Sequence, residues 1–316
     1  MPFEHASQSF AWKAGAAFLE LTVNSDLAPA YDEVRAGKGA VIVRGLPVDG
    51  PLEEFVAAVE EVGSCFGHSL SQNAQGERVG HVVDATREDP TPRMYRSNLE
   101  LRPHSDITAM VALACWHEAC SGGASVVVSG VTVHDELRRR APQLLEPLYR
   151  GYHYHRLGEE GPEEAPTTPY RVPVFAVRSG QLSCRYQRAG IAAGHRARGV
   201  PLTGQDIAAF DLFDEVARSP ENRVALRLER GDMIVINNYA LLHARSRFAD
   251  FPEPERQRHL VRLWLDAPGF RDVPQEFNLF ATNGVPPQAG KRATYDFRKL
   301  YADDPVATGG IPRIDA

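Results

Sequence analysis

Three side chains that lie far apart in the sequence have the types and spacing of a mononuclear iron site. His104 and Asp106 are separated by one residue, and on a strand side chains at i and i+2 point to the same face. His243 then has to come from a neighbouring strand. Two imidazoles and one carboxylate hold one face of an octahedral Fe(II) and leave the opposite face open. The H-x-D pattern alone is weak evidence, and the alternative is a structural hydrogen-bonded pair with an unrelated histidine.

The segment 258–265 (RHLVRLWL) alternates, so Arg258 and Arg262 share one face of a predicted strand with Leu260 and Trp264. Two arginines on an otherwise apolar face are costly unless each meets an anion. The planar guanidinium matches a carboxylate with two parallel hydrogen bonds, so an arginine beside an open iron face suits a dicarboxylate co-substrate. The alternative places both arginines on a solvated or salt-bridged surface.

Short β-rich runs alternate with a few amphipathic helices along the chain. Helices are expected at 51–63, 132–141 and 142–150. A further helix begins after Thr203 as N-cap, with Asp206 in the reciprocal position. Its predicted buried stripe comprises Ile207, Phe210, Phe213 and Val216. Strands are expected at 40–45, 109–116, 124–130, 170–178, 182–186, 224–228, 233–237 and 258–265, with Ser179-Gly180 as a hairpin turn.

No internal repeat and no long linker interrupts the sequence, so residues 1–316 are expected to form a single domain. Many short strands with a few flanking helices predict a mainly β fold, a β-sandwich or jelly roll. It would carry an N-terminal strand–helix region and a helical and loop insertion at about 130–220. The acidic segment 158–168, rich in Gly and Pro, predicts a surface loop, with a mobile lid as the alternative.

The composition is that of a globular protein that handles small molecules. Of 316 residues, 43% are hydrophobic, and the net charge of −6 provides no electrostatic footprint for nucleic acid or an anionic membrane. The first residues lack the pattern of a signal peptide, and no apolar run is long enough to span a bilayer. The four cysteines form no C-x-x-C pair, which favours reduced, buried thiols over disulfides or zinc. We expect a cytoplasmic protein, and the sequence leaves open whether it forms a homo-oligomer.

The order and spacing of three blocks resemble those of a known family. HSD at 104–106, GGAS at 122–125 and NNYALLHARSRFADFPEPERQRHLVRLW at 237–264 together look like the taurine dioxygenase-like (TauD/TfdA) family of Fe(II)/2-oxoglutarate oxygenases. The resemblance spans roughly Gly39 to Pro274, and the joint pattern is far more specific than any one block. It implies a double-stranded β-helix, the jelly roll (DSBH), and the cofactor Fe(II) with the co-substrates 2-oxoglutarate and O₂.

The resemblance also implies roles for individual residues. His104, Asp106 and His243 fall at the family's iron ligands, and Arg258 at the arginine that binds the distal carboxylate of 2-oxoglutarate. Ser125 falls where the family commonly has a threonine that hydrogen-bonds the same carboxylate, and it keeps the hydroxyl. Related halogenases lack the carboxylate ligand, so Asp106 favours oxygenation over halogenation.

Arg262 is open to three interpretations. In the taurine enzyme the matching arginine holds the anionic head of the substrate, so Arg262 is a candidate for a carboxylate, sulfonate or phosphate of the prime substrate. It can equally help to bind 2-oxoglutarate or pair with an acidic side chain. The other candidate substrate-binding residues are weaker, because each has a solvated-loop or packing alternative; they are Ser71, Gln72, Asn73, Tyr95, Asn98 and Tyr239.

The sequence therefore predicts a dioxygenase that hydroxylates a C–H bond of a small molecule while 2-oxoglutarate is decarboxylated to succinate and CO₂. The same chemistry can instead end in desaturation, cyclisation or cleavage next to a heteroatom. Two other classes stay open: a metal enzyme on this fold that uses no oxo-acid, and a non-catalytic sensor. The substrate itself is undetermined, because Arg262 indicates an anion whereas Tyr95, Trp116 and Tyr239 would suit a cation or a ring.

Overall fold

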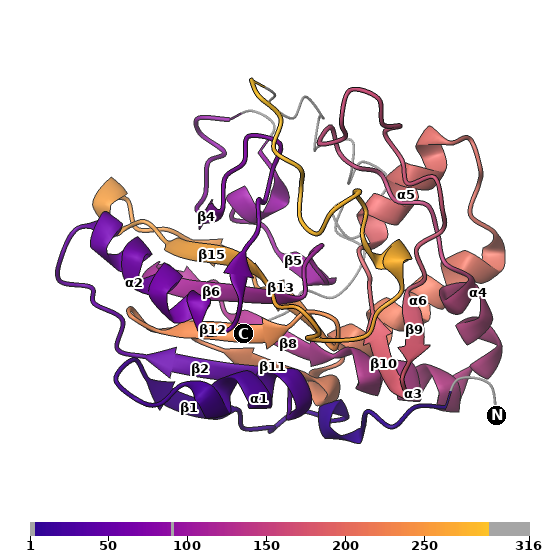
Figure 1. The fold of residues 1–316 in the computed structure, drawn as a ribbon, viewed down its shortest axis with the longest axis horizontal. Coiled ribbons are helices and arrows are strands. Elements are labelled where there is room, and N and C mark those ends of the chain that lie inside the picture. Colours follow the sequence, from indigo (N-terminus) through magenta and orange to yellow (C-terminus); the bar gives the residue numbers. More distant parts are fainter. Residues whose placement is uncertain (1–3, 90–91, 291–316) are drawn as a thin grey trace.

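The computed structural model describes residues 4–89 and 92–290, and its framework is two β-sheets (Figure 1). The larger sheet has seven strands in the order β1-β2-β12-β6-β15-β3, with β4 also pairing with β15. Its members are β1 (Leu19–Thr22), β2 (Ala40–Arg44), β3 (His68–Ser69), β4 (Val79–Val82), β6 (Met110–His117), β12 (Met233–Asn237) and β15 (His259–Asp266). The smaller sheet has the order β11-β8-β13-β5, formed by Arg223–Leu226, Ser125–Ser129, Leu241–Arg245 and Leu101–His104 respectively. Together they form the expected jelly roll.

The central strands of the larger sheet are continuously apolar because both of their faces are covered. All five residues of β12 are buried, and β6 on one side and β2 on the other pair antiparallel with it. Helices α1 (Ala28–Ala36) and α2 (Leu52–Ser64) pack on the outer face. A Cβ added at Gly63 would lie 2.6 Å from Leu263 Cδ1, so α2 sits almost against β15. The inner face, with Leu260 and Trp264, belongs to the same buried core as β8 and β13.

Four helices lie between β8 and β11 and gather at one end of the sheets (Figure 1). They are α3 (Gly130–Arg140), α4 (Leu145–Arg150), α5 (Arg188–Ala197) and α6 (Gly204–Arg218). The predicted capping box of α6 is confirmed, since Thr203 and Asp206 exchange their hydrogen bonds. Phe210, Phe213 and Val216 are buried as predicted, but Ile207 is 39% exposed. In the first turn of α6 the buried residue is Asp206, so the large apolar residues of the stripe begin at Phe210.

The hairpin formed by β9 (Phe175–Arg178) and β10 (Gln181–Cys184) confirms the predicted turn. Ser179 and Gly180 both have positive φ, 48° and 74°, which matches the right-handed twist of a two-residue hairpin. The predicted strand at 170–178 is wrong in its first half: before Phe175 the chain forms only an isolated bridge at Val172, because residues 170–174 pair with no continuous strand. A short pair, β7 (Ser121–Gly122) and β14 (Phe248–Ala249), completes the strands.

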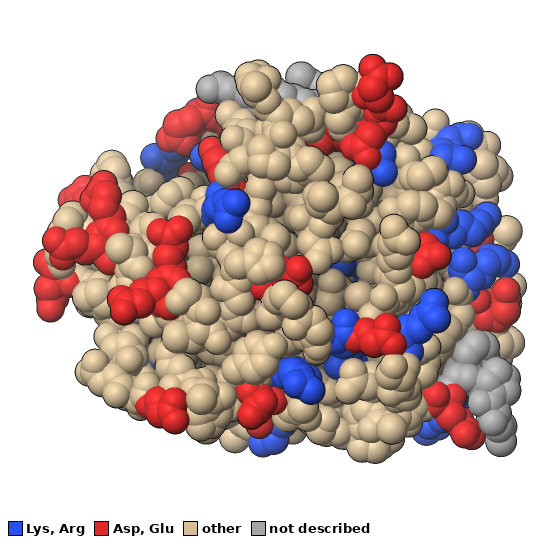
Figure 2. Space-filling view, viewed as in Figure 1, with Lys and Arg blue, Asp and Glu red and all other residues tan. Residues whose placement is uncertain are grey.

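All four cysteines are free, but only two are buried, Cys115 and Cys184; Cys65 and Cys120 are exposed, contrary to expectation. No helix in the described part of the chain is long and apolar enough to cross a membrane. Figure 2 shows acidic and basic side chains interspersed with neutral ones on this face of the molecule. Short 3₁₀ helices lie at Gln8–Phe10, Met94–Arg96, Pro142–Leu144, Pro220–Asn222, Pro254–Arg256 and Gln275–Phe277.

Candidate active site

Two histidines face each other across the smaller sheet. His104 is the last residue of β5, and His243 is the middle residue of β13. The antiparallel register pairs these two residues directly, and their ring centroids lie 4.3 Å apart. The neighbouring strand required for His243 is therefore β13, which is held in place on its other side by β8.

Asp106 lies beyond the end of β5, so the expectation that it shares a strand with His104 is wrong. The strand ends because Ser105 bonds elsewhere: its N–H donates to the carbonyl of Tyr186, and its Oγ accepts from the N–H of Tyr186. Asp106 is instead fixed by Asn238, whose Oδ1 accepts the Asp106 N–H at 3.0 Å and whose Nδ2 donates to the Asp106 carbonyl at 2.6 Å. Asn238 was not predicted; an asparagine pair at the end of the apolar strand β12 was the available signal.

The three side chains converge on one point. His104 Nε2 lies 3.8 Å from Asp106 Oδ1, and His243 Nε2 lies 3.8 Å from Asp106 Oδ2. The ligand atoms of all three residues lie within 4.8 Å of one another. His104 Nδ1 lies 2.8 Å from the carbonyl of Arg102, so Nδ1 carries the proton and donates it, and Nε2 keeps its lone pair. A carbonyl in this position is the usual way in which a ligating histidine is oriented.

The protonation states suit a divalent metal. Burial lowers the pKa of His104, and burial together with the charge of His104 lowers the pKa of His243 to about 3. Burial alone would raise the pKa of Asp106, but Arg262 and the two histidines outweigh it and lower this pKa to about 2. At neutral pH the group presents two neutral imidazoles and one carboxylate. The donor set therefore fits an Fe(II) ion with open coordination positions.

The carboxylate of Asp106 is held by two residues of β15. Trp264 Nε1 donates to Asp106 Oδ2 at 2.7 Å, and Arg262 Nη1 approaches the same oxygen at 3.2 Å. Arg262 is itself fixed by Gln72, whose Oε1 accepts from Arg262 Nε at 2.8 Å, and its guanidinium lies 4.5 Å from the ring centroid of Tyr95. Of the three interpretations of Arg262, this geometry matches the pairing with an acidic side chain.

A cavity of about 400 Å³ opens beside these residues, and His104, Asp106, Arg262 and Trp264 line it. Its other walls come from segments that are distant in sequence, at 93–95, 154–159, 185–189 and 279–285. Part of the predicted surface loop 158–168 belongs to this wall. Glu159 is only 3% exposed, accepts from the N–H of Ala74 at 2.6 Å and forms an ion pair with Arg93. Glu159 is therefore a buried, paired member of this acidic loop and is not solvated.

Of the candidate substrate-binding residues, Gln72, Tyr95 and Arg262 line the cavity. The others lie outside its lining and have contacts of their own. Ser71 Oγ donates to the carbonyl of Asn73, and the Asn73 side chain bonds Glu77. The carbonyl of Asn98 accepts from the N–H of Phe248, and the ring centroid of Tyr239 lies 5.9 Å from the guanidinium of Arg185.

Arg258 and Ser125 meet in a second, much smaller pocket of about 20 Å³, which Gly122 and Gly123 also line. Arg258 lies just before β15, is 3% exposed, and lies 4.9 Å from the ring centroid of Phe248. Its Nη1 is buried without a hydrogen-bond partner, and burial lowers its pKa to about 10. A buried guanidinium with an unsatisfied nitrogen fits the carboxylate of a dicarboxylic acid.

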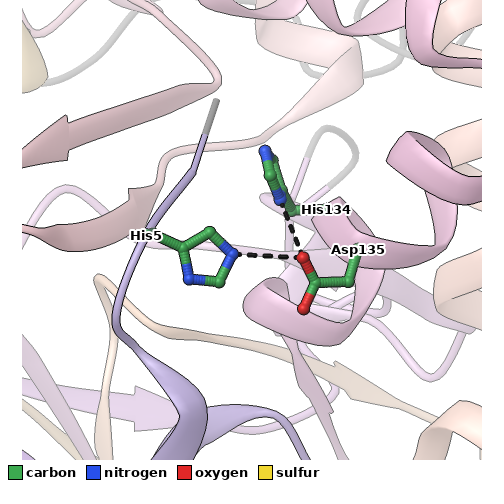
Figure 3. A group of neighbouring side chains, drawn as sticks. All are labelled: His5, His134 and Asp135. Atoms are coloured by element: carbon green, nitrogen blue, oxygen red, sulfur yellow. Dashed lines mark hydrogen bonds and ion pairs between the residues drawn. The ribbon is translucent and has the colours of Figure 1, made fainter. Parts of the chain in front are cut away.

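A second group of residues also has metal-ligating types: His5, His134 and Asp135 (Figure 3). Both histidines point at the same carboxylate oxygen of Asp135, at 3.1 Å and 3.3 Å, and the other ring nitrogen of His134 bonds the Tyr149 hydroxyl at 2.9 Å. These hydrogen bonds account for the cluster, which ties the N-terminal segment to α3. None of its members lines either pocket.

The model of the family described as "Taurine catabolism dioxygenase TauD, TfdA family" matches residues 8–264. The chain belongs to the TauD, TfdA family. It is 33% identical over 255 residues to the FR-33289 synthase of Streptomyces rubellomurinus (strain ATCC 31215), across 78% of this chain and 75% of the relative. It is 29% identical over 158 residues to the uridine-5'-phosphate dioxygenase of an Amycolatopsis species, across 49% of this chain and 55% of the relative.

Among solved structures, an asparagine oxygenase in complex with Fe(II), 3-hydroxyasparagine and succinate superposes with a TM-score of 0.57 and 17% identity. The match covers 76% of this chain and 78% of that one, which supports the jelly-roll fold. Membership of the TauD, TfdA family makes the chain a 2-oxoglutarate-dependent non-haem iron dioxygenase. Fe(II) and 2-oxoglutarate are accordingly its cofactor and co-substrate.

Proposed function

We propose that this enzyme hydroxylates a C–H bond of a small organic molecule held in the 400 Å³ cavity, with conversion of 2-oxoglutarate to succinate and CO₂. The observation that carries the proposal is the convergence of His104, Asp106 and His243, the first two of which line this cavity, with Arg258 in a separate pocket. When bound, Fe(II) supplies the oxygen-activating chemistry that couples decarboxylation to substrate oxidation. The relative named for uridine 5'-phosphate acts on a small molecule, which supports this substrate class.

In this proposal His104, Asp106 and His243 hold Fe(II) from one side. The Arg102 carbonyl keeps the His104 ring in the tautomer that exposes Nε2. Trp264 and Arg262 hold Oδ2 of Asp106, so the carboxylate cannot rotate freely. Its Oδ1 stays near His104 and its Oδ2 near His243. These partners orient the ligands before the metal binds, which raises affinity without contacting the metal themselves.

Arg258 and Ser125 bind the distal carboxylate of 2-oxoglutarate. The unsatisfied Nη1 of Arg258 gains a charged acceptor, and the Ser125 hydroxyl supplies a second, neutral donor. Because this pocket is buried, the attraction between guanidinium and carboxylate is screened far less than at the surface. The co-substrate is thereby fixed in one orientation relative to the metal ligands.

The large cavity positions the prime substrate. Apolar side chains from four segments contribute to its wall: Met94, Leu101, Ile107, Leu157 and Phe280. Its volume lies within the range of pockets that enclose small organic molecules. Product mass separates the outcomes: hydroxylation adds one oxygen, whereas desaturation or cyclisation removes two hydrogens.

The test is an anaerobic titration of the protein with Fe(II) and then 2-oxoglutarate, followed in the visible range. Wild-type protein is expected to develop a charge-transfer band, and His104→Ala to lack it. Arg258→Ala should weaken the binding of 2-oxoglutarate on the order of 100-fold, since each charge-assisted hydrogen bond contributes about 1.5–3 kcal/mol. Arg256→Ala, at an exposed position two residues earlier, is the matched control and should titrate like wild type. Absence of the band in wild-type protein contradicts the proposal.

A further inference from the structure

The large cavity carries more arginines than carboxylates. Seven arginines line it, against the four acids Glu100, Asp106, Glu159 and Asp214. Asp106 belongs to the metal-ligand group. The other three acids each form an ion pair with an arginine: Glu100 with Arg218 at 3.1 Å, Glu159 with Arg93, and Asp214 with Arg188 at 2.7 Å. The lining therefore has a surplus of positive charge.

Arg185 is the most buried of these arginines. It follows β10 directly, lines the cavity and is only 2% exposed. Its Nη1 donates to the backbone carbonyl of Asp106, and its guanidinium lies 5.5 Å and 5.9 Å from the ring centroids of Phe277 and Tyr239. Its Nε is buried without a hydrogen-bond partner. Within the described residues, Arg185 forms no ion pair with a carboxylate.

The positive charge of Arg185 is not needed to hold the backbone carbonyl of Asp106. Asn238 already donates to the same carbonyl at 2.6 Å and is fully buried. Burying a guanidinium without an anion costs several kcal/mol in desolvation, which a neutral donor would avoid. The two rings offset part of this cost through cation–π attraction, but they leave Nε unsatisfied. The charge at this position is explained if an anion reaches it from the cavity.

We propose that Arg185 binds an oxyanion of the prime substrate, so that the substrate is a small organic anion bearing a carboxylate, phosphonate or phosphate ester. This rests on the proposed function above, which assigns the distal carboxylate of 2-oxoglutarate to Arg258. Through its bond to the Asp106 carbonyl, Arg185 lies next to the metal-ligand group. An anion held there would place the neighbouring carbon atoms of the substrate beside the residues that would hold the metal. Arg185 is then a specificity-determining residue.

The test uses the full chain loaded with redox-inactive Mn(II) and saturating 2-oxoglutarate, with methylphosphonate and acetate as probes. Paramagnetic relaxation of the probe nuclei reports binding near the metal without turnover. With wild-type protein, the relaxation of the probe nuclei should increase with protein-bound probe and reach saturation. Arg185→Gln should weaken it tenfold or more, because a charge-assisted hydrogen bond contributes about 1.5–3 kcal/mol. Arg185→Lys keeps the charge but loses the planar fork, so its affinity for the probes should lie between those of wild type and Arg185→Gln.

Arg271→Gln is the matched control. Arg271 is also buried, at 9% exposed, and also has one unsatisfied nitrogen, but it lies outside both pockets and bonds Ser183. It should bind the probes like wild type. Unchanged probe affinity in Arg185→Gln or Arg185→Lys overturns the inference, as does a wild-type protein that shows no saturable effect with either probe. Loss of 2-oxoglutarate binding in folded Arg185→Gln overturns it too, because the arginine would then serve the co-substrate. Failure of wild-type protein to bind Mn(II) or 2-oxoglutarate at all would instead count against the proposed function.

Discussion

The indole nitrogen of Trp264 lies 2.7 Å from Oδ2 of Asp106, the same oxygen that Arg262 approaches. Both donors come from one face of β15, at positions two residues apart. The strand therefore presents a neutral donor and a positive charge to a single carboxylate oxygen. This arrangement restricts the carboxylate to one orientation relative to the two histidines, and it keeps the group ionised.

Replacing Trp264 with phenylalanine removes the hydrogen bond while it keeps most of the ring packing. We expect Trp264→Phe to lower Fe(II) affinity at least tenfold, since the loss of a partner that orients a metal ligand typically has this effect. An anaerobic metal titration measures it. Trp116→Phe is the control: Trp116 is similarly buried but packs against Phe55, away from the metal-ligand group. Equal affinities for the two variants would show that the indole N–H does not orient Asp106.

We expect position 123 to require glycine for two reasons: its left-handed backbone conformation and the close packing of Arg258 and Phe248 against it. It has φ +74°, and an added Cβ would lie 3.0 Å from Arg258 Nε and 3.3 Å from Phe248 Cβ. Gly180 has the same φ of +74° with nothing within 4 Å of the added Cβ. Both alanine variants should lose about 1 kcal/mol of unfolding free energy from the left-handed backbone. Only Gly123→Ala should also weaken 2-oxoglutarate binding, as measured by the anaerobic titration. A similar loss of binding in Gly180→Ala would contradict this assignment.

The buried histidines should make the metal-free protein sensitive to mild acid. Burial lowers the pKa of nine histidines, namely His81, His104, His117, His134, His153, His155, His195, His243 and His259. The unfolded chain, with histidine pKa values of about 6.5, then binds more protons than the folded one below that pH. The free energy of unfolding should therefore fall as the pH drops from about 6.5 toward 4, the folded pKa of His259.

Urea unfolding of the metal-free protein at pH 7.5, 6 and 5 measures this dependence. His259 accounts for part of it, because its Nε2 lies 2.8 Å from His81 Nδ1 and protonating both rings would place two charges together. His259→Gln should reduce the slope. A stability that is constant or rises between pH 7.5 and 5 would contradict the prediction.

Patterns of a few neighbouring residues were sufficient to predict many of the strands and helices. The strand at 233–237 and the capping box at Thr203–Asp206 were predicted where they occur, because alternation, burial and capping depend on adjacent residues. The predictions that were wrong depended on distant contacts. The strand containing His104 ends there because Ser105 bonds Tyr186, and Glu159 is buried because it pairs with Arg93. Neither partner is visible in the local pattern.

The sequence by itself determined which residue types were available for a metal site and, through the order of its blocks, the family of the chain. Only the tertiary structure decided how they meet. The register of β5 against β13 pairs His104 with His243, and Asn238 fixes the backbone of Asp106 from more than 130 positions away. Arg185 was not predicted, because nothing local distinguishes a surface arginine from a buried one; its surroundings come from Asp106, Tyr239 and Phe277. The physical reason is the same throughout: side-chain types and short-range periodicity are properties of neighbouring residues, whereas burial and pairing of charges arise when distant segments pack together.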